Sequence, residues 1–110
     1  MRAITIAITI CLCTAAGTAA QDAKVSKGEK LYVDQKCALC HSVGDKGNKK
    51  GPLDDVGSKL SAAEVHEWLV DPTAMAAKTK ATRKPPMKSY TLPKEDADAL
   101  VAYLMSLKKK

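Results

Sequence analysis

Two cysteines and a histidine stand close together as Cys37, Cys40 and His41, in the order C-x-x-C-H. This spacing is the attachment signature of c-type haem. Each thiol can add across one vinyl group of the porphyrin to form a thioether bond, and the two intervening residues allow both sulfur atoms to reach the same edge of the ring. The imidazole of His41 then lies under the ring, where it can bind the iron. Because the chain has no second copy of the motif, the sequence predicts one haem, held through Cys37 and Cys40.

Two other kinds of site use the C-x-x-C spacing. A redox-active dithiol usually lies at a strand-to-helix turn within a βαβ pattern, and the sequence shows no such pattern. A zinc site needs four ligands at suitable spacing, but there is no second C-x-x-C pair and the only other histidine is His66. Haem attachment is therefore the leading interpretation.

The first 20 residues have the layout of a secretory signal peptide. Arg2 precedes an apolar run that ends near Ala16, and small residues then lead to Ala20, which suits the last position before a cleavage site. The alternative is an uncleaved membrane anchor, but the run is short for a spanning helix, which needs about 20 residues. We expect residues 1–20 to be a cleaved signal and residues 21–110 to form one periplasmic domain.

Composition limits what the mature chain can be. Cleavage would leave 90 residues that contain no phenylalanine and only four aromatic side chains. A chain of this size buries little apolar surface by itself, so a haem would supply the missing core. The formal charge of +6 for the full chain becomes +5 without Arg2. A basic surface suits an acidic protein partner or an anionic membrane face, whereas export and the lack of a nucleic-acid motif argue against nucleic acid as the partner.

The remaining sequence predicts helices separated by long loops, and no strand alternation. Ser26 with Glu29, and Ser61 with Glu64, each have the spacing of a capping box at a helix start. The expected elements are a helix over 26–37, a loop over 41–60, a helix over 61–70, a short helical segment from Pro72 to about Lys78, a loop over 79–91, and an amphipathic helix over 93–107.

These elements, in this order, resemble a class I c-type cytochrome with a single haem. The motifs that carry the resemblance are Gly28-x-x-x-Tyr32, the C-x-x-C-H motif, G-P-L at 51–53, a loop with a methionine, and the amphipathic C-terminal helix, so that residues 26–107 are covered. The resemblance implies an all-α fold, the small cytochrome c fold, with helices wrapped around one covalently bound haem.

The resemblance also assigns roles to individual residues. It implies that Gly28 and Tyr32 pack against the region from Leu100 to Leu104, Tyr103 included. It implies further that the carbonyl group of Pro52 accepts a hydrogen bond from the iron-binding imidazole, a contact that orients the ring and raises its basicity.

The sixth iron ligand requires a choice among three methionines of the mature chain. Met105 falls within the last predicted helix, and Met75 within the short helical segment. Met87 lies in the loop before the last helix, where the family places its ligand, and is therefore the expected ligand. In a common form of the family a proline follows the methionine ligand, whereas Lys88 follows Met87 here. His66 is the alternative nitrogen ligand, but its place in the middle of a predicted helix favours a surface histidine.

With His41 and Met87 both bound to iron, no coordination site is open to a substrate. The chain is therefore expected to be a one-electron carrier of a respiratory chain rather than an enzyme. One alternative is a haem subunit of a periplasmic dehydrogenase or oxidase complex, with possible contact to membrane complexes. The other is a five-coordinate haem protein that binds small ligands or reduces peroxide. Trp68 and Tyr90 are expected to pack, with polar tips that could instead reach the haem.

A group of basic residues surrounds these segments and is expected to form a docking surface for an acidic redox partner. Its alternative is an ordinary solvated surface. Its members are Lys36, Lys46, Lys49, Lys50, Lys80, Arg83, Lys84 and Lys88.

Overall fold

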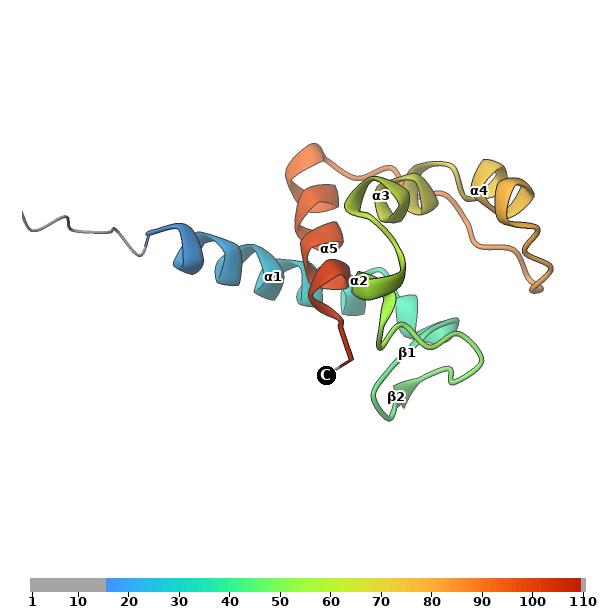
Figure 1. The fold of residues 1–110 in the computed structure, drawn as a ribbon, viewed down its shortest axis with the longest axis horizontal. Coiled ribbons are helices and arrows are strands. Elements are labelled where there is room, and N and C mark those ends of the chain that lie inside the picture. Colours follow the sequence, from blue (N-terminus) through green and yellow to red (C-terminus); the bar gives the residue numbers. More distant parts are fainter. Residues whose placement is uncertain (1–15, 110) are drawn as a thin grey trace, which may run out of the picture.

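The computed structural model describes residues 16–109 and is mostly helical (Figure 1). Its elements are α1 (Ala16–Asp34), a 3-10 turn (Cys37–Leu39), β1 (Ser42–Val43), β2 (Lys46–Gly47), α2 (Val56–Lys59), α3 (Ala62–Val70), α4 (Pro72–Thr79) and α5 (Lys94–Ser106). Among the described residues, no helix combines the length and the apolar character that crossing a membrane requires. The predicted signal peptide lies mostly outside the described part, and α1 runs through its expected cleavage position.

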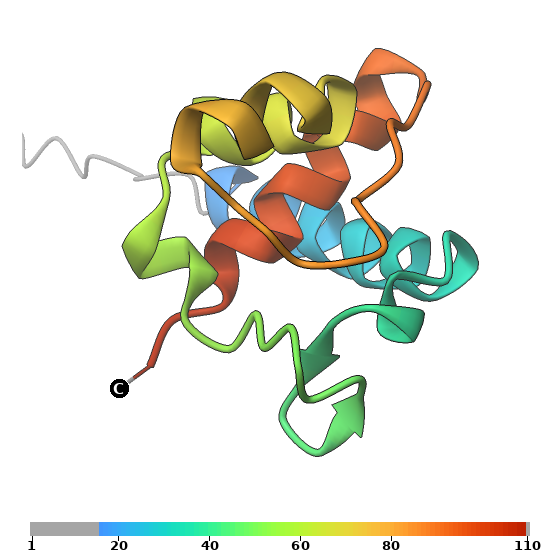
Figure 2. The ribbon, with the colours of Figure 1, turned by 90° about the vertical axis from the view of Figure 1, so that its right-hand side faces the viewer.

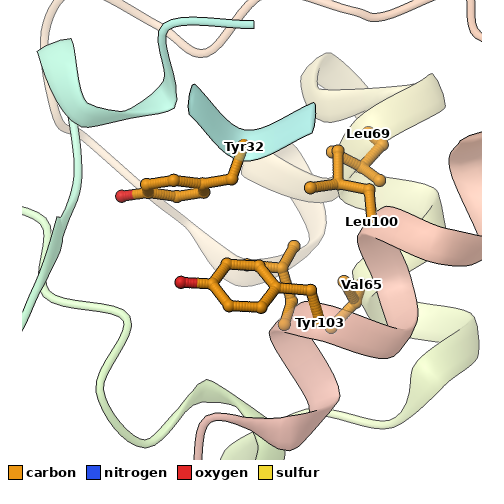
Figure 3. Packing of buried hydrophobic residues seen from close by; sticks show 6 residues of the cluster. Tyr32, Val65, Leu69, Leu100 and Tyr103 are labelled. Atoms are coloured by element: carbon orange, nitrogen blue, oxygen red, sulfur yellow. The ribbon is translucent and has the colours of Figure 1, made fainter. Parts of the chain in front are cut away.

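The first and last helices cross and form the centre of the fold. Gly28 lies at the crossing, where a Cβ atom would collide with the backbone carbonyl of Ala99 and with Tyr103. One turn further on, the ring of Tyr32 meets that of Tyr103 edge to face, with the centroids 5.7 Å apart (Figure 3). The contacts implied for Gly28 and Tyr32 are therefore confirmed.

The buried core continues from this crossing onto α3. Val65 and Leu69 of α3 pack with Leu100 and Leu104 of α5, and all four side chains are less than 10% exposed. The apolar spacing of the last helix thus faces the core as expected. Lys27 and Asp96 add an ion pair between α1 and α5 at 2.9 Å.

Two predicted helix starts are confirmed by their side-chain bonds. Ser61 Oγ accepts from the backbone N–H of Glu64 at 3.1 Å, and Glu64 Oε1 accepts from the N–H of Ser61 at 3.1 Å, which completes the capping box of α3. Asp71 caps α4 by accepting from the N–H of Ala74, with Pro72 in the first helical position.

The first predicted helix start is wrong. Ser26 lies within α1, which begins before it at Ala16, so Ser26 and Glu29 form no capping box. The pattern fails there because a capping residue must itself have a non-helical backbone, whereas the helix that begins at Ala16 continues through Ser26.

The expected loop over 41–60 contains two strands and a short helix. β1 and β2 pair as an antiparallel hairpin, with Ser42 opposite Gly47. α2 lies against the end of α5, where the N–H of Gly57 donates to Leu107 O at 2.9 Å. The expectation that residues 41–60 form only a loop was therefore wrong. Strands of two residues are too short to show the alternation by which a sequence reveals a strand.

A backbone hydrogen bond fixes the long loop between α4 and α5 to the helices. The backbone N–H of Tyr90 donates to the carbonyl oxygen of Leu69 in α3 at 2.7 Å. Figures 1 and 2 place this loop and the hairpin at the end of the molecule where α1 finishes and the C-x-x-C-H motif begins.

Candidate haem site

The C-x-x-C-H motif is wound into a tight turn directly after α1. Lys36 has a left-handed backbone conformation (φ 58°), which turns the chain away from the helix axis. The N–H groups of Cys40 and His41 then both donate to the carbonyl of Cys37, at 3.1 and 2.9 Å. These bonds close the backbone of the motif into a single compact turn.

Asn48 attaches the β1–β2 hairpin to this turn. Its backbone N–H donates to the carbonyl groups of Ala38 and His41, and its side-chain amide donates to Leu39 O at 3.1 Å. The role of Asn48 was not predicted from the sequence. An asparagine directly after Gly47 in a turn-rich segment is nevertheless typical of side-chain hydrogen bonds to nearby backbone groups.

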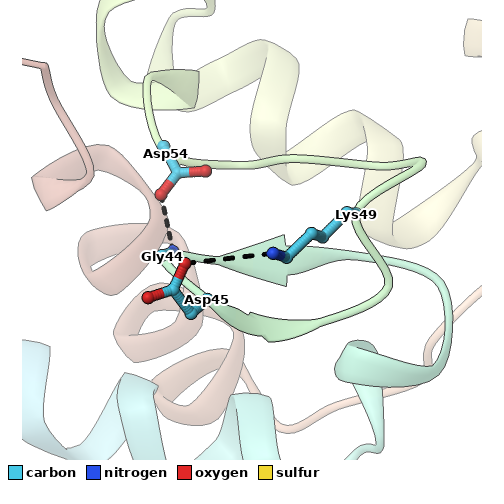
Figure 4. Close-up of polar contacts among 4 residues, drawn as sticks. All are labelled: Gly44, Asp45, Lys49 and Asp54. Carbon is cyan, nitrogen blue, oxygen red and sulfur yellow. Dashed lines mark hydrogen bonds and ion pairs between the residues drawn. The ribbon is translucent and has the colours of Figure 1, made fainter.

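The tip of the hairpin is tied to the segment that follows it. Asp54 accepts a hydrogen bond from the N–H of Gly44 at 2.6 Å, and Lys49 lies 3.9 Å from Asp45 (Figure 4). The hairpin is thus held between the motif on one side and residues 52–54 on the other.

His41 is presented in the form that a metal requires. Its Nδ1 atom lies 3.1 Å from the carbonyl oxygen of Gly51. Because a carbonyl can only accept, Nδ1 carries the hydrogen and the lone pair of Nε2 is left for a metal. Burial lowers the pKa of His41 against the opposing effect of this hydrogen bond, and the charge of Arg83 lowers it further, so the imidazole is neutral at pH 7.

The resemblance implied that the carbonyl of Pro52 accepts the hydrogen bond from His41. That prediction is wrong, because the acceptor is the carbonyl of Gly51. Ser42 forms a parallel bridge with Pro52, its N–H donating to Gly51 O and its carbonyl accepting from Leu53 N–H. In this register the Gly51 carbonyl, one residue earlier than expected, faces the imidazole. A Cβ atom at Gly51 would collide with Cys40 O and the guanidinium of Arg83, and would lie 3.0 Å from His41 Nδ1.

The two cysteines are unpaired and differ in exposure. Cys37 is half-buried and Cys40 is exposed. Burial raises the pKa of the Cys37 thiol, and the ammonium group of Lys88 opposes this rise. Within residues 16–109 no group of three or more His, Cys, Asp or Glu side chains is placed to hold a metal ion, so the zinc alternative has no ligand set there.

The loop that carries Met87 lies beside the motif. The electrostatic effect of Lys88 on Cys37 comes from the residue that directly follows Met87. The pKa of Tyr90 is raised by burial and by the nearby Cys37 and Cys40. The ammonium of Lys88 also lies 5.1 Å from the centre of the Tyr90 ring. Met87 itself is half-buried and packs against the hydrophobic core.

The other candidate ligands have different surroundings. Met75 is buried within α4, and Met105 lies in α5 with its carbonyl against Gly57. His66 lines a groove with Val70, Leu92 and Lys94, among others, and none of the motif residues lines that groove. Only Met87 of these residues belongs to the loop beside the motif.

A mostly apolar groove is lined by Pro52, the residue that follows Gly51, and Trp68 forms part of its wall. Trp68 is half-buried, and the groove has a volume of about 300 Å³. Its other lining residues include Leu53, Val56 and Leu60. Such walls suit a large apolar group with a few polar contacts.

One buried polar atom also indicates a missing partner. The hydroxyl oxygen of Tyr32 is fully enclosed and has no hydrogen-bond partner among the described residues. Taken together with the neutral His41 and the unpaired thiols of Cys37 and Cys40, this atom shows that the residues present fit a haem group.

The comparison with protein families agrees with this geometry. A family model described as Cytochrome c matches residues 25–108, which span the whole site, all of α5 and the part of α1 that crosses it. No significant match was found among curated proteins, and none among solved structures. Members of the matched family bind haem c and serve typically as electron carriers. The match covers well over half of the sequence and agrees with the small helical fold and the C-x-x-C-H turn, and the chain therefore belongs to the cytochrome c family.

Proposed function

We propose that this chain is a periplasmic one-electron carrier with one haem c, which Cys37 and Cys40 would hold through thioether bonds. When bound, the haem iron supplies the redox chemistry by cycling between the ferric and ferrous states. The observation that carries the proposal is the Nδ1–H of His41 bonded to Gly51 O, because this bond directs Nε2 away from the protein backbone as a free metal ligand.

Met87 is proposed as the second axial ligand. Its support is the position of its neighbours, since the charge of Lys88 lowers the pKa of Cys37 and both motif cysteines raise the pKa of Tyr90. Ligation by Met87 together with His41 would raise the reduction potential of the haem and would leave no site on the iron open to a substrate. The chain's own residues would then exclude substrates, which suits electron transfer rather than enzymatic turnover.

The test is a visible spectrum of the exported protein, ferric and then reduced, for the wild type and two methionine variants. The wild type is expected to show a c-type reduced spectrum and the weak far-red ferric band of iron bound to methionine. Met87→Ala should lose that band and allow the reduced protein to bind carbon monoxide. Met105→Ala, which also removes a half-buried methionine, should keep the band. Retention of the band in Met87→Ala would reject Met87 as a ligand, and absence of haem from the wild type would reject the proposed function.

Export to the periplasm is proposed from the N-terminal layout of Arg2, the apolar run and Ala20. N-terminal sequencing of the haem-loaded protein from a periplasmic extract tests it. A mature chain that starts at Gln21 is the expected result, and recovery of the protein in the cytoplasm with Met1 intact would contradict it.

The partner is proposed to be a redox protein with an acidic docking surface. All eight members of the basic group named from the sequence are exposed. Two members lie beside the motif, because the charge of Lys88 acts on Cys37 and that of Arg83 acts on His41. Opposite charges on two redox proteins speed their encounter and align their exposed edges.

A further inference from the structure

Tyr32 carries a hydroxyl group that neither the helix crossing nor the proposed iron ligands use. The residue is 6% exposed, and its hydroxyl oxygen is the one side-chain atom among the described residues that is fully buried without a hydrogen-bond partner. A buried hydroxyl without a partner is costly. A phenylalanine would fill the same place against Tyr103 without that cost, so packing at the crossing does not account for the hydroxyl.

The surroundings of the hydroxyl show which way it faces. Burial raises the pKa of Tyr32 to about 12, and Cys37, Tyr103 and Asp54 add to the rise in that order. Cys37 begins the motif, and Asp54 lies just after the segment that carries the acceptor of His41. Figure 3 shows the ring directed away from Leu69 and Leu100, with the hydroxyl on the far side from the core. The phenol therefore points toward the site and stays protonated, as a donor, at neutral pH.

We propose that the Tyr32 hydroxyl donates a hydrogen bond to the haem group on its Cys37 side, where the thioether sulfur formed at Cys37 is the acceptor. The inference rests on the proposed haem site. Sulfur is a weak acceptor, and the free thiol of Cys37 forms no bond with this hydroxyl. Attachment would fix the Cys37 sulfur at the cofactor edge, where it could accept from Tyr32. Tyr32 is thus a positioning residue that links the helix crossing to the cofactor edge.

The bond has an electrical consequence. The hydrogen end of the O–H dipole would face the haem group, and this positive end favours the state with one more electron. Hydrogen bonds around a haem or its ligands are one of the means by which a protein sets the reduction potential. Tyr32 is therefore expected to raise the potential, whereas a purely structural tyrosine would leave it unchanged.

Tyr103 provides a matched control. It is also a buried tyrosine in the same ring pair, at 8% exposure. Its pKa is raised by burial and by the exposed carboxylate of Glu29, not by the motif. Tyr32→Phe and Tyr103→Phe each remove one hydroxyl from the same cluster and leave both rings in place.

The experiment measures the reduction potential and the redox-difference infrared spectrum of the haem-loaded wild type and both variants, with tyrosine isotopically labelled. Tyr32→Phe is expected to lower the equilibrium constant for reduction about threefold, which corresponds to ~28 mV for a one-electron couple. A labelled tyrosine band that responds to reduction should vanish in Tyr32→Phe and remain in Tyr103→Phe.

The outcomes separate this inference from the proposed function. Equal potentials for all three proteins, or a tyrosine band that survives in Tyr32→Phe, would overturn the role of Tyr32 while the haem spectrum still supported an electron carrier. Loss of haem from the wild type would instead remove the proposed function itself. If the infrared bands of tyrosine in the wild type were the same in the ferric and ferrous states, the inference would also be overturned, because a hydroxyl bonded to the haem group should respond to the change in its charge.

Discussion

Gly28 of α1 lies so close to the carbonyl group of Ala99 in α5 that no Cβ atom fits between the two helices. The neighbouring atoms belong to the backbone of Ala99 and to the Cβ of Tyr103, so rotation of a side chain cannot relieve the clash. Close approach of two backbones at a crossing is a use to which glycine alone is suited.

Gly28→Ala is expected to destabilise the protein by about 3 kcal/mol, at the upper end of the range for overpacked cores. The loss should occur even though alanine is the better helix former by about 1 kcal/mol. Thermal unfolding of the haem-loaded protein measures it, and a fall in Tm of more than ~10 °C is expected for a domain of this size.

Ser26→Ala is the control for that experiment. Ser26 is exposed, lies in the same helix two residues earlier, and caps nothing. Its replacement should change stability by less than about 0.5 kcal/mol. A large loss at Ser26 would show that α1 begins there after all, and an unchanged Tm for Gly28→Ala would mean that the two helices do not touch at this point.

Ser61→Ala should cost about 1 kcal/mol, because it removes the oxygen that accepts from the N–H of Glu64 at the start of α3. Glu64→Gln is the matched control, since glutamine can still accept from the N–H of Ser61. Denaturant unfolding of both variants measures the difference. Equal stability of the Ser61→Ala variant and the wild type would contradict the capping box.

Alkaline unfolding should depend on Tyr32. The pKa of this phenol is raised from 10.0 to about 12 in the folded protein, so the folded state holds its proton more tightly than the unfolded state does. The stability gained in this way is fully present below pH 10 and is lost as the pH rises toward 12.

Unfolding free energies measured from pH 9 to pH 12 test this dependence. The wild type is expected to lose more stability over the interval than Tyr32→Phe, which has no phenol to ionise, while lysine titration affects both proteins equally. Parallel curves for the two proteins would show that Tyr32 ionises as readily in the folded state as in the unfolded one.

Electron transfer to an acidic partner should slow down when the charge of Lys88 is reversed. Lys88→Glu places a negative charge beside Cys37, where a partner would approach, so the association rate should fall and should lose most of its dependence on salt. Stopped-flow kinetics at two ionic strengths measure both effects.

Lys24→Glu changes the net charge of the protein by the same amount but in the middle of α1. Lys24 acts on Asp98 rather than on Cys37, and about 15 Å of helix separates it from Asp34, where α1 ends before the motif. This variant should retain most of the wild-type rate. Equal slowing by the two variants would assign the effect to net charge and exclude a docking surface at the haem edge.

Motifs formed by residues close together in the sequence could be predicted, whereas the exact start of a helix and the pairing register of a loop could not. Ser61 and Ser26 have the same capping spacing, but only at Ser61 does the preceding chain leave the helix. Likewise the G-P-L segment was correctly placed beside His41, yet the bond goes to Gly51 and not Pro52. That register is set by the bridge between Ser42 and Pro52, a contact ten residues apart.

The site itself was predictable to the extent that it is local. Cys37, Cys40 and His41 are contiguous, so their spacing alone defined the motif. The contacts of Asn48, Arg83 and Tyr32 with this motif or its supporting segment depend on how loops and helices fold back onto it, and no periodicity in the sequence encodes them.

The meeting of Gly28 with Ala99 also determines when the molecule can fold. The two residues are about 70 positions apart, and contacts of such long separation form slowly because a large loop must close before they contribute any stability. A ribosome adds about 5–20 residues per second, so several seconds pass between the synthesis of α1 and that of α5, the helix that it packs against. The chain therefore stays open until α5 has been made, and an open chain is one that chaperones can bind and that can be passed through a narrow channel before its core exists.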